Sequence, residues 1–217
     1  MRVSTKRLAY KLKKYQVPVE YVKGWDSSRI DPYDGSSDFW GVLLHHTAGT
    51  NSLNWVVNTN PYAPVRACHF LVDKDGTVHV VSGVGAYHAG RGGPLKFPKG
   101  PRIPKDQGNK FLYGIEIESL GTSAKIDGSD QGMSVEQVVS TAMLSAALLN
   151  AMRRSWRSYG VFRVIRHKDW TARKPDVKQD LTWWREAILI AKKNKGNVSE
   201  TRKEITLFVK NYPKGKL

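Results

Sequence analysis

Histidines are the residues of this chain with the widest choice of chemistry, and there are six of them: His45, His46, His69, His79, His88 and His167. His167 follows a predicted strand, and a short loop then returns a carboxylate at Asp176. Imidazole nitrogen and carboxylate oxygen are donors that Zn²⁺ takes in tetrahedral sites. A histidine of the segment LLHHTAGT (43–50), at the end of another predicted strand, is a candidate third ligand. From spacing alone, a metal site and a set of structural histidines both remain open.

Strand alternation separates neighbouring candidates. Successive side chains of a strand point to opposite faces, so at most one of His45 and His46 is a ligand. In the segment YGIEIE (113–118), the same rule places Glu116 and Glu118 on one face of the strand. Two carboxylates on one face suit proton transfer, whereas a solvated strand face is the ordinary alternative.

The elements that must position these residues alternate between strands and helices. The predicted strands cover 39–46, 69–73, 77–81, 113–118 and 161–166, and the predicted helices cover 4–15, 52–59, 134 to about Trp156, and 181–193. Ser134 and Gln137 form a capping-box pattern, and Asp75-Gly76 predicts a hairpin turn. Residues 26–38 and 90–110 are predicted loops because they are rich in Gly and Pro. This alternation predicts an α/β fold with one central sheet flanked by helices.

The length of 217 residues fits one domain with extensions or two small domains. The chain carries a net charge of +16, of which residues 1–23 and 191–217 contribute +6 each. Basic flanks favour a polyanionic partner such as nucleic acid, anionic lipid or an acidic wall polymer, although solubility alone is the alternative explanation. Charge by itself does not choose between these.

Several classes of protein are excluded by the sequence. The single cysteine cannot form an internal disulfide. No apolar run approaches the roughly 18 residues that would span a bilayer. The basic N-terminus lacks the uninterrupted apolar stretch of a secretion signal, so we expect a protein made in the cytoplasm. No helix-turn-helix, RRM or zinc-finger pattern is present, so we expect no nucleic-acid partner.

Five segments carry a family resemblance when they are read in order: LLHHTAGT, HFLVDKDGTVH, YHAG, YGIEIE and RHKDWTARKPD. Together they resemble the zinc-dependent N-acetylmuramoyl-L-alanine amidases of the type-2 amidase and peptidoglycan-recognition-protein superfamily, to which phage endolysins belong. The resemblance covers about residues 38–190. It implies a single central mixed β-sheet, with a catalytic domain over 38–193 between a basic N-terminal extension (1–37) and a basic C-terminal tail (194–217).

The resemblance also implies a metal site. It makes His45 the first zinc ligand, His167 the second and Asp176 the third. Three protein ligands leave one position open, which is the arrangement of a catalytic zinc rather than a structural one. His46 is then expected to pack or hydrogen-bond nearby.

Further roles follow from the same resemblance. Glu116 takes the position of the general base, with Glu118 as the alternative. Lys174 takes the position of a cation that stabilises the oxyanion formed when the amide carbonyl is attacked. His88, in the YHAG segment, is expected to bind substrate. Cys68 departs from the family pattern, because many relatives have a tyrosine at this position. Without that tyrosine, catalysis is expected to depend more on Glu116, and activity is not excluded.

The implied reaction is hydrolysis of the amide that joins N-acetylmuramic acid to L-alanine in peptidoglycan, with Zn²⁺ as cofactor. We expect a monomeric phage endolysin, held in the host cytoplasm until lysis, whose basic termini bind anionic wall polymers. A cytoplasmic amidase that recycles wall fragments is the alternative enzyme. A module that binds peptidoglycan without cleaving it is the alternative outside the enzymes; Cys68 favours it, and the set His45, His167 and Asp176 opposes it.

Overall fold

The computed structural model describes residues 3–27, 38–59, 66–98, 100–152 and 160–212. Its centre is a six-stranded sheet in the order β1-β4-β3-β7-β2-β8. The strands are β1 (Val19–Tyr21), β2 (Gly41–His46), β3 (Phe70–Val72), β4 (Val78–Val80), β7 (Leu112–Ile117) and β8 (Val164–Arg166). Only the β3–β4 hairpin is antiparallel, and the other neighbouring pairs of this sheet are parallel. The predicted fold, one mixed sheet flanked by helices, is therefore confirmed.

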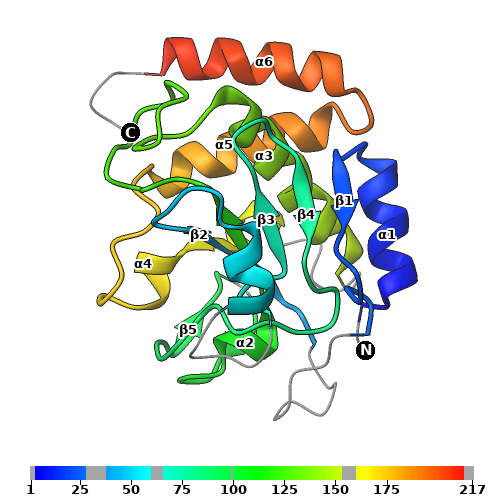
Figure 1. The fold of residues 1–217 in the computed structure, drawn as a ribbon, viewed down its shortest axis with the longest axis vertical. Helices are drawn as coiled ribbons and strands as arrows, with labels where there is room; N and C mark the ends of the chain where they lie inside the picture. Colours follow the sequence, from blue (N-terminus) through cyan, green and yellow to red (C-terminus); the bar gives the residue numbers. More distant parts are fainter. Residues whose placement is uncertain (1–2, 28–37, 60–65, 99, 153–159, 213–217) are drawn as a thin grey trace.

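Four long helices pack on one face of the sheet (Figure 1). They are α1 (Thr5–Lys14), α3 (Val135–Ala151), α5 (Leu181–Lys193) and α6 (Val198–Asn211). α3 lies against the sheet and is buried along nearly its whole length, and the other three helices contact it. The opposite face is covered by shorter elements: η1 (Trp55–Thr59), β5 (Leu95–Lys96), β6 (Arg102–Ile103), α2 (Gly108–Phe111) and α4 (His167–Trp170).

The alternation of β7 divides its side chains as predicted. Ile115 and Ile117 point into the main core beneath α3, whereas Glu116 points to the opposite face. β2 follows the same rule, since Leu44 joins the main core and His45 lies in register with Glu116. The polar candidates therefore gather on the face that the long helices leave free.

α3 begins as the sequence predicts but ends earlier. The Ser134–Gln137 capping box is present, with the serine hydroxyl accepting from the Gln137 amide. The prediction extended the helix to about Trp156, which lies outside the described residues, whereas α3 ends at Ala151.

Two arginines far away in the sequence satisfy the end of α3. Arg7 donates to the carbonyl of Ala151 at 2.6 Å, and Arg163 donates to that of Leu149 at 3.4 Å. Cations that bind the last carbonyls of a helix stabilise its C-terminus. Neither arginine is adjacent in the sequence to the end of α3, so local sequence patterns predicted a helix that was too long.

The segment 194–217, read from sequence as a tail, contains the helix α6. Asn197 caps it by accepting from the Glu200 amide, and Ile205 is fully buried. Phe208 packs near Trp183, with ring centroids 5.5 Å apart. At the other terminus, Leu8 and Leu12 of α1 are buried as the predicted helical spacing requires. Both basic ends of the chain thus contribute helices that pack on α3.

The remaining predictions agree at the level of elements. The first four predicted strands, the Asp75-Gly76 turn and the helix over 181–193 are confirmed. The fifth predicted strand, 161–166, is shorter than expected, because 160–163 form a 3-10 helix and the strand begins at Val164. The predicted loop 90–110 contains the short strands β5 and β6 and the start of α2, while most of the predicted loop 26–38 lies outside the described residues. In the described part of the chain, no helix is both long enough and apolar enough to cross a bilayer.

Candidate active site

Sheet topology brings together residues that are up to 131 positions apart. His45 lies near the C-terminal end of β2, and its backbone pairs with that of Glu116 on the neighbouring strand β7. His167 follows β8 directly as the first residue of α4, and Asp176 lies in the loop after that short helix. β2, β7 and β8 run parallel, so their carboxyl ends meet at one edge of the sheet.

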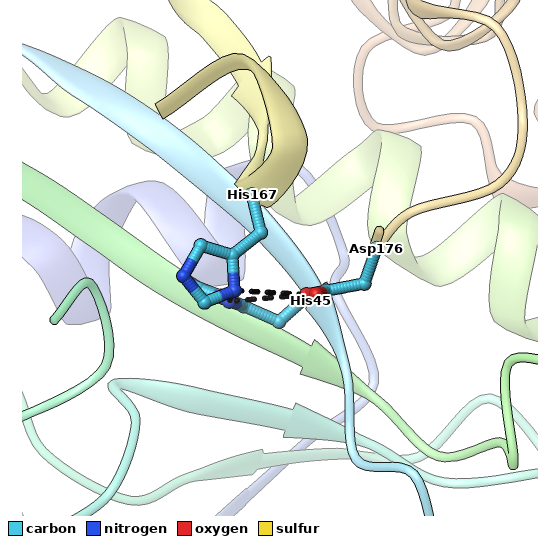
Figure 2. A group of neighbouring side chains, drawn as sticks. All are labelled: His45, His167 and Asp176. Carbon is cyan, nitrogen blue, oxygen red and sulfur yellow. Dashed lines mark hydrogen bonds and ion pairs between the residues drawn. The ribbon is translucent and has the colours of Figure 1, made fainter. Parts of the chain in front are cut away.

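At this edge, three donor atoms converge on a common point (Figure 2). His45 Nδ1 lies 2.9 Å from His167 Nδ1 and 3.5 Å from Asp176 Oδ2. His167 Nδ1 lies 3.0 Å from the same carboxylate oxygen. All three residues are buried.

The hydrogen bonds on the far side of the two imidazoles determine which nitrogens carry protons. His88 Nε2 lies 3.0 Å from the carbonyl of Leu112, so it must donate, and His88 Nδ1 is left as an acceptor. His45 Nε2, 3.1 Å from that acceptor, must therefore donate as well. His167 Nε2 faces the carbonyl of Ala89 at 3.3 Å and donates to it.

The Nδ1 atoms of His45 and His167 are consequently turned toward each other and toward the Asp176 carboxylate. Burial, opposed by the Asp176 carboxylate, lowers the pKa of His45 to about 4, which keeps that ring neutral at pH 7. Burial and the neighbouring His45 and His69 rings likewise hold the pKa of His88 well below its usual value. The two ring nitrogens and the carboxylate oxygen form a compact set of donor atoms, and a cation bound between them would contact all three.

The donor set fits a transition metal. In a tetrahedral zinc site with bonds of about 2.0–2.1 Å, neighbouring donors are about 3.3 Å apart. The three observed separations, from 2.9 to 3.5 Å, bracket that value. Among the described residues, this is the one group of three His, Cys, Asp or Glu side chains whose donor atoms converge in this way.

The loop that carries Asp176 is anchored at both ends. Arg166 forms a bidentate ion pair with Asp169, with N···O distances of 2.9 and 2.8 Å, and also donates to the carbonyl of Gln179. The amide of Lys168 donates to the carbonyl of Asp176 at 2.7 Å. These bonds hold the carboxylate beside His167, a role that sequence analysis missed although Arg166 and Asp169 stand at helical i, i+3 spacing.

Glu116 and Lys174 line the same cavity, of about 300 Å³, as the three converging residues. Glu116 is buried, and its Oε2 atom has no hydrogen-bond partner among the described residues. Burial and the nearby Asp176 carboxylate raise the pKa of Glu116 to about 8, although the Lys174 ammonium acts in the opposite direction. A carboxylate whose charge is so poorly solvated is a strong proton acceptor. Lys174 is exposed at the mouth of the cavity.

His88 lies behind His45, with both ring nitrogens bonded to protein atoms. Its place depends on Gly114 in β7, because a Cβ there would lie 2.3 Å from the His88 ring. The sequence prediction did not single out this glycine. A glycine inside a strand, where a ring must approach the backbone closely, was the available signal. His88 also lines the cavity, and its role in binding substrate stays a prediction.

Three other candidates lie apart from the converging atoms. The ring of His46 packs over Gly121, whose φ of +66° and close approach leave no room for a side chain. Glu118 accepts a hydrogen bond from the amide of Ser52 and lines a different cavity. Cys68 is fully buried, and burial together with the Glu116 charge raises the pKa of its thiol well above the usual value.

Comparison with known proteins places this geometry in a family. The family model for N-acetylmuramoyl-L-alanine amidase matches residues 35–179. The chain belongs to that amidase family. It is therefore a hydrolytic enzyme, and the amidase acts on peptidoglycan.

Solved structures similar to this amidase include an N-acetylmuramoyl-L-alanine amidase and an endolysin. The N-acetylmuramoyl-L-alanine amidase LysC from Clostridium intestinale URNW is 18% identical, with a TM-score of 0.47 over 70% of this chain and 83% of the other. The Ph2119 endolysin from Thermus scotoductus MAT2119 bacteriophage Ph2119 is 17% identical, with a TM-score of 0.48 over 77% of this chain and 97% of the other. No curated protein matches the sequence.

Substituting Gly114 tests the packing behind His45. In Gly114→Ala the new Cβ must push the His88 ring away, so we expect unfolding to require about 1–3 kcal/mol less free energy in urea titrations. Gly49→Ala is the matched control, since the nearest atom to its added Cβ lies 3.8 Å away. Equal, small effects of the two substitutions would contradict the account.

Proposed function

We propose that the amidase is a zinc enzyme that hydrolyses the bond between N-acetylmuramic acid and L-alanine. His45, His167 and Asp176 would hold the ion. The observation that carries the proposal is the convergence of two Nδ1 atoms and a carboxylate oxygen beside a buried glutamate whose Oε2 has no hydrogen-bond partner among the described residues. Zinc in such a site supplies Lewis acidity, which activates water and polarises an amide carbonyl.

We assign the proton transfers to Glu116. Glu116 lines the cavity and its Oε2 has no hydrogen-bond partner in the described part of the chain, so this carboxylate is free to accept a proton from the attacking water and pass it to the nitrogen of the departing L-alanine. Lys174 donates to the oxygen that becomes negative as the carbonyl is attacked. We further propose that residues 38–193 carry the catalytic residues, and that the basic segments 1–37 and 194–217 pack onto them through α1, β1 and α6.

Neither Glu116 nor Lys174 is a proposed metal ligand, so substituting each one tests its role in catalysis without removing the ion. Glu116→Gln should lower the rate of hydrolysis about 10²–10⁴-fold, since a general base is lost. Lys174→Met should lower it about 10²–10³-fold, since an oxyanion donor is lost. The rate is measured as release of new N-terminal alanine from purified peptidoglycan, with and without a zinc chelator, alongside the metal content of each variant.

The matched control is Glu118→Gln, an isosteric change on the same strand segment but in the other cavity. Its glutamine oxygen can still accept from Ser52, so we expect near-normal release of alanine. Release that resists the chelator would overturn zinc dependence. Full activity of Glu116→Gln would overturn the proton-transfer role while leaving zinc dependence standing.

We also propose that the amidase is a phage endolysin, made in the host cytoplasm, that binds anionic polymers of the cell wall. The proposed wall contact is supported by the proximity of the two basic terminal segments. Lys195 Nζ lies 5.8 Å from the centroid of the Tyr15 ring, and Gly196 approaches the carbonyl of Lys14. The exposed Lys13, Lys14 and Lys195 therefore form one basic cluster. It lies on the α3 side of the sheet, opposite His45 and Glu116, so a bound polymer leaves the cavity open.

Charge reversal tests this wall contact without deleting α6, which belongs to the core. The triple variant Lys13→Glu, Lys14→Glu and Lys195→Glu should co-sediment with cell walls several-fold less at low salt while remaining folded. The control Lys96→Glu, Lys105→Glu and Lys125→Glu makes the same change in net charge at scattered exposed sites. Equal loss of sedimentation in both triples would refute a dedicated cluster.

A further inference from the structure

A second cavity, of about 320 Å³, adjoins the catalytic one. The two share four lining residues: Tyr87, His88, His167 and Lys174. Beyond them the second cavity is lined by the loop after His88 and by the loop between α4 and Asp176. A ligand positioned at Lys174 can therefore extend directly into it.

This second cavity has a basic lining. Arg91, Arg173 and Lys174 contribute to it, and no carboxylate is among its lining residues. Within the described part of the chain, none of the three cations forms an ion pair. Arg173 is nevertheless held in place, because its Nη2 donates to the carbonyl of Arg91 at 2.5 Å. We call this cavity the basic arm.

A groove of opposite charge contrasts with the basic arm. It has a volume of about 680 Å³ and is lined by Asp73, Asp75 and Glu118. Its one cation, Lys74, already donates to the carbonyls of Ser129 and Gly132. An anionic group is therefore repelled from this groove and attracted to the basic arm.

We infer that the basic arm binds the stem peptide of the substrate through the free α-carboxylate of the second residue, a γ-linked glutamate; this inference rests on the proposed function. In the substrate the lactyl carboxyl of the sugar is tied up in the scissile amide, so the amino-sugar units of the glycan are uncharged. The nearest negative charge lies on the peptide side.

The dimensions agree with this assignment. The carboxylate lies one residue beyond the scissile nitrogen, within about 7 Å, since an extended chain advances about 3.3–3.6 Å per residue. Arg173 is the residue next to Lys174, which we place at the scissile carbonyl, and both residues line the basic arm. A guanidinium offers paired N–H donors that suit a carboxylate.

Two muropeptides that differ by one charge test the inference. N-acetylmuramoyl-L-alanyl-D-glutamyl-L-lysine, joined through the glutamate γ-carboxyl, has the free α-carboxylate, and the corresponding isoglutaminyl peptide has a neutral amide in its place. Each is titrated calorimetrically into zinc-loaded Glu116→Gln protein, so that binding is measured without turnover. We expect the acid to bind about tenfold more tightly, as for a charge-assisted hydrogen bond at an exposed arginine, and the ratio to fall with added salt.

The arginines are then substituted one at a time in the same protein. Loss of the preference in Arg173→Ala or Arg91→Ala supports the inference, while Arg102→Ala, an exposed arginine outside the lining, should retain it. Equal binding of the two muropeptides, or a preference that survives both substitutions, would overturn it. Failure of the proposed function has a different signature, because the wild-type enzyme would then leave both muropeptides uncleaved.

Discussion

Two backbone carbonyls determine the chemistry of this site. The carbonyl of Leu112 fixes the proton of His88 and, through it, the proton of His45, while the carbonyl of Ala89 fixes the proton of His167. The consequence is that both Nδ1 atoms face the Asp176 carboxylate. Metal-binding histidines generally owe their tautomer to such a partner on the other nitrogen. The same hydrogen bonds would orient both rings toward a cation bound at this site.

The fold supports this arrangement by separating two tasks. One face of the sheet, covered by α1, α3, α5 and α6, provides the main core. The other face carries His45 and Glu116 in adjacent register positions, and the glycine at 114 leaves room for the ring that orients His45. Charge is distributed around the same edge, with cations in the basic arm and carboxylates in the groove beyond η1. A substrate with an anionic peptide would therefore bind with its peptide in the basic arm rather than in the groove.

Local patterns in the sequence predicted the elements well. Strand alternation was sufficient to place Glu116 opposite the core, and the capping box located the start of α3. The end of α3 was wrong because its caps, Arg7 and Arg163, come from remote parts of the chain. α6 was missed because its lysines suggested a tail, although Thr201, Ile205, Phe208 and Tyr212 recur at helical spacing.

The site was predictable in its residues rather than in its geometry. The candidate ligands came from a resemblance, since spacing alone left metal and structural readings open. No sequence rule states which imidazole nitrogen is protonated, because that depends on carbonyls brought near by the fold.

The most direct test of the account is a zinc titration of protein stripped of metal. We predict one equivalent of tightly bound zinc for the wild-type chain, and loss of that binding in His45→Ala and in Asp176→Ala while both variants remain folded. Wild-type protein that binds no stoichiometric zinc, or zinc binding that survives both substitutions, would contradict the central claim.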